Sequence, residues 1–90
     1  MTEVLDGNAA AGALAEVFAP EMTVAITTCA GCSDVRPIGE LRAYLQTPGL
    51  VLRCASCHAV QIRVVRAAGR AWFDFRGIRA LQVELRPAGR

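Results

Sequence analysis

The 90-residue chain contains no lysine, only one histidine, and few aromatic residues, which make up 6% of the sequence. It has no run of about 18 apolar residues, the length that a membrane-spanning helix needs. Residues 1–8 hold no basic side chain, which argues against a signal peptide. We therefore expect a cytoplasmic protein with no membrane segment, in which the cysteines stay reduced.

The sequence also lacks the groupings that most often carry catalysis. The one histidine is His58, there is no Gly-x-Ser-x-Gly motif or phosphate-binding loop, and the acidic residues are scattered along the chain. Acid–base catalysis mostly uses histidine or well-placed carboxylates. We therefore expect that the protein is not an enzyme.

The net charge of +2 conceals an uneven distribution of charge along the chain. Residues 1–52 carry six acids and two arginines, a balance of −4, whereas residues 53–90 carry eight arginines and two acids, a balance of +6. The two oppositely charged parts could attract each other, within one molecule or between two copies, in a salt-sensitive way. The oligomeric state is not fixed by the sequence.

An Ala-rich segment near the N-terminus has apolar residues at helical spacing. The residues that carry this pattern are Leu14, Val17 and Phe18. Either Asp6 or Asn8 could cap the helix, and Pro20 would end it. The pattern predicts a helix over about residues 8–19, weakened by Gly12.

Alternation with a period of two follows this segment and predicts several short strands. Met22, Val24 and Ile26 should face inward on a strand that runs into Cys29. Residues 50–53 should lead into Cys54 in the same way, and residues 41–45 fit either a strand or a helical turn. Further alternation puts apolar residues inward on three later strands, with residues 67–70 as a hairpin loop. The inward residues of these strands would be Val60, Ile62, Val64, Ala71, Phe73, Phe75, Leu81, Val83 and Leu85.

The four cysteines form two Cys-x2-Cys pairs, Cys29 with Cys32 and Cys54 with Cys57, separated by 21 residues. Two intervening residues let both sulfurs of a pair turn toward one metal ion at about 2.3 Å. Two such pairs, each at the end of a strand, complete a tetrahedron of the kind found in zinc fingers. The spacing therefore predicts one structural Zn²⁺, which would add stability that a small core lacks.

Other interpretations of the cysteines stay open. Rubredoxins hold iron with the same two pairs, so the ligands alone do not distinguish Fe from Zn²⁺. A thioredoxin-like redox site would need a helix after one pair, and no helical pattern follows Cys32 or Cys57. Cys54 to His58 matches the c-type haem attachment pattern, but haem is attached to exported chains and would leave the first pair unexplained. His58 could replace a thiolate, donate a hydrogen bond to sulfur, or begin a strand on the solvent side.

Several segments along the chain together form a recognisable set: Leu5–Asn8, Ala11–Gly12, the Cys29/Cys32 pair, Pro48–Gly49, Arg53–Cys54 with Cys57, and Trp72–Gly77. In these features the sequence resembles a family of small bacterial proteins that carry a domain of unknown function, expected to be of zinc-ribbon type. The resemblance spans most of the chain and implies a zinc-ribbon fold, but it supplies no reaction, substrate or partner. Many zinc ribbons have glycine after the second cysteine of each pair, where this chain has Ser33 and His58.

Together these observations predict one small α+β domain over residues 1–90, stapled by zinc. Its N-terminal helix would pack on an antiparallel, rubredoxin-like zinc-ribbon sheet. The zinc ribbon would occupy about residues 21–66, and further strands about residues 70–86. Asp74 should make a cross-strand charge pair with arginine neighbours.

Two kinds of partner are compatible with such a module. The first is a protein, with Trp72 as an exposed anchor, unless the N-terminal helix covers Trp72. The second is a nucleic acid, although the Zn²⁺(Cys)₄ centre would carry about −2 and offset the charge of the chain. The arginines that could contact a nucleic acid or another anion are Arg53, Arg63, Arg66, Arg70, Arg76 and Arg79.

Overall fold

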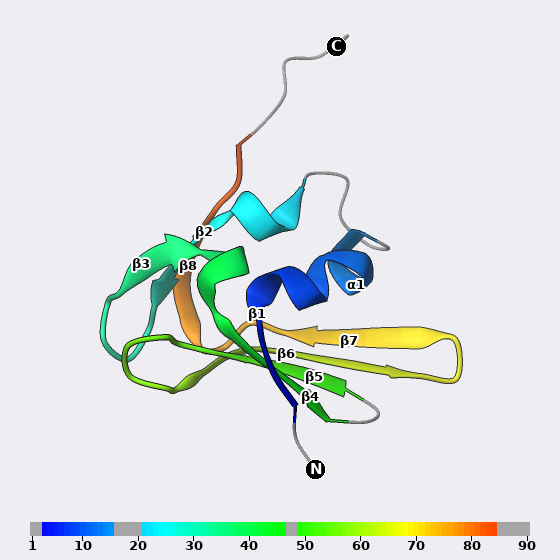
Figure 1. Ribbon diagram of the computed structural model, residues 1–90. Helices are drawn as coiled ribbons and strands as arrows, with labels where there is room; N and C mark the ends of the chain where they lie inside the picture. The colour runs from blue at the N-terminus through cyan, green and yellow to red at the C-terminus, as the bar shows by residue number, and fades with distance from the viewer. Residues whose placement is uncertain (1–2, 16–20, 47–48, 85–90) are drawn as a thin grey trace, which may run out of the picture.

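The computed structural model describes residues 3–15, 21–46 and 49–84, which form two antiparallel sheets with short helical turns (Figure 1). The larger sheet has the strand order β1-β4-β5-β6-β7, and the smaller sheet has the order β3-β2-β8. The strands of the larger sheet are β1 (Glu3–Asp6), β4 (Arg42–Gln46), β5 (Gly49–Arg53), β6 (Val60–Ala67) and β7 (Arg70–Asp74). Those of the smaller sheet are β2 (Ile26–Cys29), β3 (Val35–Pro37) and β8 (Ile78–Gln82). The helical turns are η1 (Gly7–Ala10), α1 (Ala11–Ala15), η2 (Met22–Val24) and η3 (Ile38–Glu40).

The expected α+β fold with an N-terminal helix on a sheet is wrong. The described chain has no helix of seven or more residues, and its fold is small and mostly β. Residues Glu3–Asp6, which precede the expected helix, form a strand that pairs with β4, and this pairing satisfies the backbone groups on the side facing β4. Asp6 then accepts a hydrogen bond from the N–H of Asn8 (3.1 Å), so it caps η1, and only the short α1 follows. Leu14 of the expected helical face is buried, and Val17 and Phe18 lie outside the described residues.

The strand expected from Met22 onward begins later and buries the other set of side chains. Residues Met22–Val24 form η2, and β2 starts at Ile26. Val24 is 64% exposed, whereas Thr27 and Cys29 are fully buried. Thr27 tolerates burial because its hydroxyl donates a hydrogen bond to the carbonyl of Arg36 on β3 (2.9 Å). The apolar alternation therefore predicted the wrong face for Val24 and for β2, although Met22 is buried in the core as expected.

Residues 41–45, which the sequence left undecided, lie mainly in the strand β4. The hairpin expected around residues 67–70 is confirmed, because β6 and β7 pair antiparallel across the two residues Ala68 and Gly69. Both have positive φ, +53° and +73°, which is the backbone of a type I′ turn. Its twist matches the right-handed twist of the paired strands.

The hydrophobic core lies between the larger sheet and a layer made of the smaller sheet and the helical turns (Figure 1). From the larger sheet it includes Ala43, Leu50, Leu52, Ile62 and Val64. The covering layer contributes Ala10, Leu14, Met22, Ala25 and Ile38, with Ile78 and Leu81 packed against them. As expected, Phe73, Phe75, Leu81 and Val83 pack on this core, whereas Ala71 is exposed and Leu85 lies outside the described residues.

The other face of the larger sheet has no layer over it in the described chain, and we call it the open face. Side chains on it alternate with the core residues of the same strands. Val51 marks this face, because it alternates with Leu50 and Leu52 and is not a member of the core cluster. The residues of the open face that matter below are Arg42, Tyr44, Arg53, Arg63, Arg70 and Trp72.

The connection between β7 and β8 fastens the two sheets together at Gly77. The N–H of Gly77 donates to the carbonyl of Gln61 on β6 (3.1 Å), and its own carbonyl accepts from the N–H of Ala30 (3.0 Å). A Cβ at Gly77 would lie 1.9 Å from the carbonyl oxygen of Val60. Only glycine fits this close approach of two backbones.

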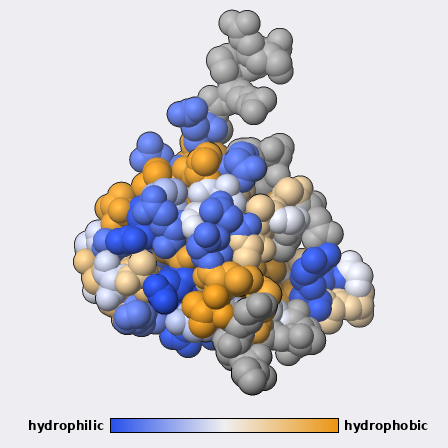
Figure 2. Space-filling model, in the orientation of Figure 1, coloured by the Kyte–Doolittle hydropathy of each residue, from blue (hydrophilic) through white to orange (hydrophobic). Residues whose placement is uncertain are grey.

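Strand β1 forms one edge of the larger sheet and exposes apolar side chains. Val4 is 47% exposed, and Leu5 and Leu45 are each 38% exposed. Figure 2 shows an apolar patch over this edge, with hydrophilic residues above it. No described helix is long and apolar enough to cross a membrane.

Candidate metal centre

The two cysteine pairs come from different sheets and meet at one point. Cys29 is the last residue of β2 in the smaller sheet, and Cys54 directly follows β5 in the larger sheet. The four sulfur atoms of Cys29, Cys32, Cys54 and Cys57 all lie within 4.8 Å of one another. The sequence prediction that these cysteines gather into one possible metal site is confirmed at this level.

Each pair sits in a turn with the same backbone hydrogen bonds, and we call these turns knuckle 1 (Cys29–Asp34) and knuckle 2 (Cys54–Ala59). In knuckle 1, the N–H of Cys29 donates to the carbonyl of Asp34 (2.9 Å), and the N–H of Ser33 donates to the carbonyl of Cys29 (3.0 Å). The equivalent two bonds in knuckle 2 measure 2.9 and 3.0 Å. The two turns are therefore alike although their sequences differ.

Backbone N–H groups also point at the first sulfur of each knuckle. The N–H of Gly31 lies 3.4 Å from the sulfur of Cys29, and the N–H of Ser56 lies 3.4 Å from the sulfur of Cys54. Donors directed at sulfur favour the thiolate over the thiol. Both turns are thus arranged to present negatively charged sulfur, the form that binds a metal ion.

The residue after the second cysteine of each knuckle adopts the left-handed backbone that glycine usually supplies. Ser33 has φ +66° and His58 has φ +67°. The absence of glycine therefore does not change the course of either turn. It does carry a conformational cost, because a side chain in this region crowds the following carbonyl.

The spacing of the sulfurs fits a tetrahedral ion. The sulfurs of Cys29 and Cys57 are 3.7 Å apart, and those of Cys32 and Cys54 are 3.6 Å apart. A tetrahedron with metal–sulfur bonds of about 2.3 Å has edges of about 3.8 Å. A disulfide would need about 2.05 Å, and all four cysteines are free. Cys29 and Cys54 are buried whereas Cys32 and Cys57 are exposed, so the site lies at the surface with one sulfur of each knuckle inside.

The pKa values of Cys29 and Cys32 shift in opposite directions within the cluster. Although burial raises the pKa of Cys29, the backbone N–H groups of Cys32 and Gly31 lower it to about 6. The N–H of Asp34 lowers the pKa of Cys32, but desolvation and the other three cysteine sulfurs raise it to about 12. A cation placed among the sulfurs would neutralise the charge of the thiolates that form there.

His58 is exposed and lies in knuckle 2, before β6 begins at Val60. Its ring nitrogens are not part of the cluster of possible ligand atoms, which consists of the four cysteine sulfurs. Its carbonyl accepts a hydrogen bond from the guanidinium of Arg53 (2.9 Å). Neither knuckle is followed by a helix, since β3 comes after Cys32 and β6 after Cys57, so the structure lacks the helix that a thioredoxin-like site needs.

Gln61 is a buried polar residue beside the site. The alternation of Val60, Ile62 and Val64 as inward residues had predicted that Gln61 would face the solvent. The pairing of β5 and β6 shifts at Leu52 and Arg53, which leaves Gln61 without a partner residue on β5. Gln61 is 1% exposed, and its amide atoms have no hydrogen bond of ordinary geometry with any described residue. The same side chain helps to lower the pKa of Cys29, which places it next to that sulfur. Strict alternation gives no signal for a bulge, so the sequence could not identify this neighbour.

The structure separates the six arginines that the sequence grouped together. Arg53, Arg63 and Arg70 lie on the open face, together with Arg42. Arg66 alternates onto the opposite face of β6, Arg76 pairs with Asp74 (2.6 Å), and Arg79 donates from β8 to the hydroxyl of Ser33 (3.0 Å). Asp74 faces Arg63 across the strands, but its ion pair is with Arg76, two residues further along the chain. The basic residues therefore do not form one continuous surface.

Trp72 lies on the open face and is 53% exposed. The N-terminal turn and α1 lie on the other side of the sheet (Figure 1), so the alternative in which they cover Trp72 is wrong. Among the described residues, Trp72 and Tyr44 are the two aromatic residues of this face.

Comparison with known proteins yields a family and no characterised relative. No curated protein and no solved structure matches the chain. The sequence profile of DUF6510, a family of unknown function, matches residues 1–86. This match covers almost the whole chain and includes all four cysteines. The chain therefore belongs to DUF6510, a family of unknown function.

Proposed function

We propose that this protein is a non-catalytic binding module whose fold is held together by one structural Zn²⁺ on Cys29, Cys32, Cys54 and Cys57. The observation that carries the proposal is the gathering of four sulfurs within 4.8 Å, with cross-knuckle distances close to the edge of a zinc tetrahedron. Four protein thiolates close the coordination shell. A metal ion held in this way has no open position for a substrate, which favours a structural role over catalysis.

The position of the site in the fold supports the structural role. Knuckle 1 extends the smaller sheet and knuckle 2 extends the larger sheet, so an ion between them would cross-link the two layers around the core. Structural Zn²⁺ contributes about 10–16 kcal/mol of apparent binding energy in zinc-finger peptides. A typical small domain has a total stability of about 5–15 kcal/mol. We therefore expect the folded state to depend on the metal ion.

Metal analysis of the purified protein, combined with its visible spectrum and a thermal melt with and without a chelator, tests this proposal. We expect about one zinc per chain, no visible colour, and loss of the cooperative melt when the chelator removes the ion. A red protein that contains iron would identify a rubredoxin-like electron carrier instead. A metal-free protein whose melt ignores the chelator would contradict any structural metal.

The module would act through the surface that the metal ion stabilises. The open face is the best candidate for the part of that surface that binds a partner. It presents Trp72, a residue type that binding interfaces favour, next to several arginines. A protein or a nucleic acid can use a face of this composition. The arrangement of its charges and aromatic rings distinguishes the two.

A further inference from the structure

The open face concentrates positive charge that the net charge of the chain conceals. Arg42 and Arg53 lie directly opposite each other on β4 and β5. Like charges in directly opposed positions destabilise a sheet unless an anion offsets them. Two acids share this face with the four arginines, Asp6 beside Arg42 on β1 and Asp74 opposite Arg63 on β7. Asp74 is paired with Arg76, and Arg42, Arg63 and Arg70 make no ion pair with a described acid, so the face keeps an excess of positive charge. This face is therefore complementary to an anionic partner.

Aromatic rings lie among these arginines. Trp72 on β7 is 53% exposed and is a diagonal neighbour of Arg63 on β6, close enough for both to contact one ligand. Tyr44 on β4 is half-buried, and the guanidinium of Arg53 lies 5.6 Å from the centre of its ring. Aromatic and guanidinium planes on an open sheet are the surfaces on which unpaired bases stack.

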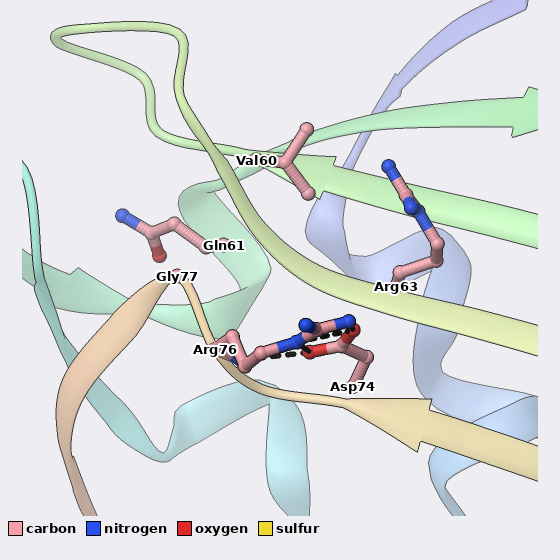
Figure 3. A pocket seen from close by; sticks show the side chains of 6 residues that line it. All are labelled: Val60, Gln61, Arg63, Asp74, Arg76 and Gly77. Carbon is pink, nitrogen blue, oxygen red and sulfur yellow. Dashed lines mark hydrogen bonds and ion pairs between the residues drawn. The ribbon is translucent and has the colours of Figure 1, made fainter.

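A hollow lined by Arg63 and Asp74, two residues of the open face, adjoins this surface. It has a volume of about 350 Å³ and lies between β6 and the end of β7 (Figure 3). Arg63 lines it on one side, and the ion pair of Asp74 with Arg76 lines it on the other. Its volume is at the lower end of the range for small-molecule sites. The Gln61 side chain points away from the arginines of the hollow, so the charged groups in view are those of Arg63, Asp74 and Arg76.

We propose that the open face binds single-stranded nucleic acid, with a base stacked on Trp72 and phosphates contacted by Arg63, Arg70 and Arg42. This inference rests on the proposed function, because the sheet must first be held in shape by the metal ion. A single strand is favoured over a duplex, because stacking on Trp72 needs a base that is not already paired. An acidic protein segment would meet the charges but would leave the exposed indole without a stacking partner.

Binding can be measured on the zinc-loaded full chain with a fluorescein-labelled oligothymidylate of about 10 nucleotides, the site size typical of such surfaces. Trp72 is the only tryptophan, so intrinsic fluorescence reports directly on this position. We expect saturable binding with quenching of Trp72, binding at least 10-fold weaker for a duplex of the same length, and a loss of about 10-fold or more in Trp72→Ala. Between about 50 and 200 mM salt, Arg63→Gln should reduce the slope of log K against log salt by about 0.7.

Arg79→Gln is the matched control, because Arg79 lies on the smaller sheet and donates to Ser33. It should bind the oligonucleotide as the wild type does. Equal losses in Arg63→Gln and Arg79→Gln would overturn the proposal, as would absence of binding at low salt. A poly-glutamate peptide that binds as tightly as the oligonucleotide and is insensitive to Trp72→Ala would also overturn it, in favour of an acidic protein. Zinc content and the thermal melt of every variant are recorded separately, so failure of this inference is distinguishable from failure of the structural metal.

Discussion

Knuckle 1 and knuckle 2 have the same backbone but are fastened to the fold in different ways. Both have the same pair of backbone hydrogen bonds, and φ at their ends differs by only one degree, +66° against +67°. Knuckle 1 is held by Gly77 through Ala30, whereas knuckle 2 is held by Arg53 through the carbonyl of His58. The shared geometry therefore follows from presenting two sulfurs to one point, and the side chains around each knuckle only fix it to its own sheet.

The largest effect should come from removing the buried ligand of either knuckle. Cys29→Ser and Cys54→Ser each replace a fully buried sulfur, and a structural zinc contributes about as much free energy as a whole small domain. We expect both variants to lose zinc and the cooperative melt to the same extent, as measured by elemental analysis and circular dichroism.

Cys32→Ser provides the matched comparison, because Cys32 is exposed and water can take its place at the metal ion. It should retain part of the zinc and melt at a lower temperature than the wild type. If Cys29→Ser or Cys54→Ser kept a full equivalent of zinc, the two knuckles would not contribute equally to one site.

The second largest effect on stability should distinguish the two knuckles, because only knuckle 1 is hydrogen-bonded to Gly77. A Cβ in Gly77→Ala would lie 1.9 Å from the carbonyl oxygen of Val60 and 2.4 Å from Cα of Gln61. Relief of this overlap must displace the backbone that holds Ala30, at a cost of about 1–3 kcal/mol or more in the free energy of unfolding. Urea denaturation measures it. Gly12→Ala is the control, since a Cβ there meets nothing within 4 Å, and it should leave stability unchanged or slightly raised.

Glycine at the last position of each knuckle should have a smaller effect on stability and should raise it. His58→Gly should stabilise the protein by about 0.5–1 kcal/mol. Glycine relieves the strain of the left-handed backbone at this position, and the greater entropy of the unfolded chain offsets part of that gain. Ser33→Gly should gain less, because it also removes the hydroxyl that accepts from Arg79. Paired thermal melts of the zinc-loaded variants decide the order, and destabilisation by His58→Gly would refute the strain that we assign to this position.

The smallest effect on stability should come from the ion pair at the end of knuckle 1. Arg36 pairs with Asp34, and both side chains are partly exposed. Exposed pairs contribute about 0–1 kcal/mol. Arg36→Gln should therefore lower the free energy of unfolding by no more than about 1 kcal/mol in urea, and it should leave the zinc content unchanged. A larger loss, or loss of zinc, would mean that Arg36 supports the metal site itself.

Features that depend on neighbouring residues were predictable from the sequence. The spacing of the cysteines predicted that they meet, since two residues between sulfurs fix their separation within a turn. The hairpin at Ala68 and Gly69 was predicted too, because its turn chemistry is local. The hairpin depends on contacts within a few residues of the chain. The cysteine cluster depends on two short turns whose sulfurs can reach one ion.

Features that depend on distant partners were not predictable. Glu3–Asp6 became a strand because β4 lies beside it, which the Ala-rich sequence that follows does not indicate. Thr27 is buried because the carbonyl of Arg36 accepts its hydroxyl, so apolar alternation predicted the wrong face of β2. Gln61 turned inward at a bulge in the pairing of two strands, which no single-strand pattern contains. Pairing partners, rather than local propensity, decided each of these features.

X-ray absorption at the zinc edge of the purified full-length protein tests the central claim most directly, because it reports both the metal and its ligands. A closed site made by the two knuckles predicts a shell of four sulfurs at about 2.3 Å and no lighter ligand. A shell with one nitrogen or oxygen in place of a sulfur would contradict the closed tetrathiolate, and so would an absence of zinc from a folded protein.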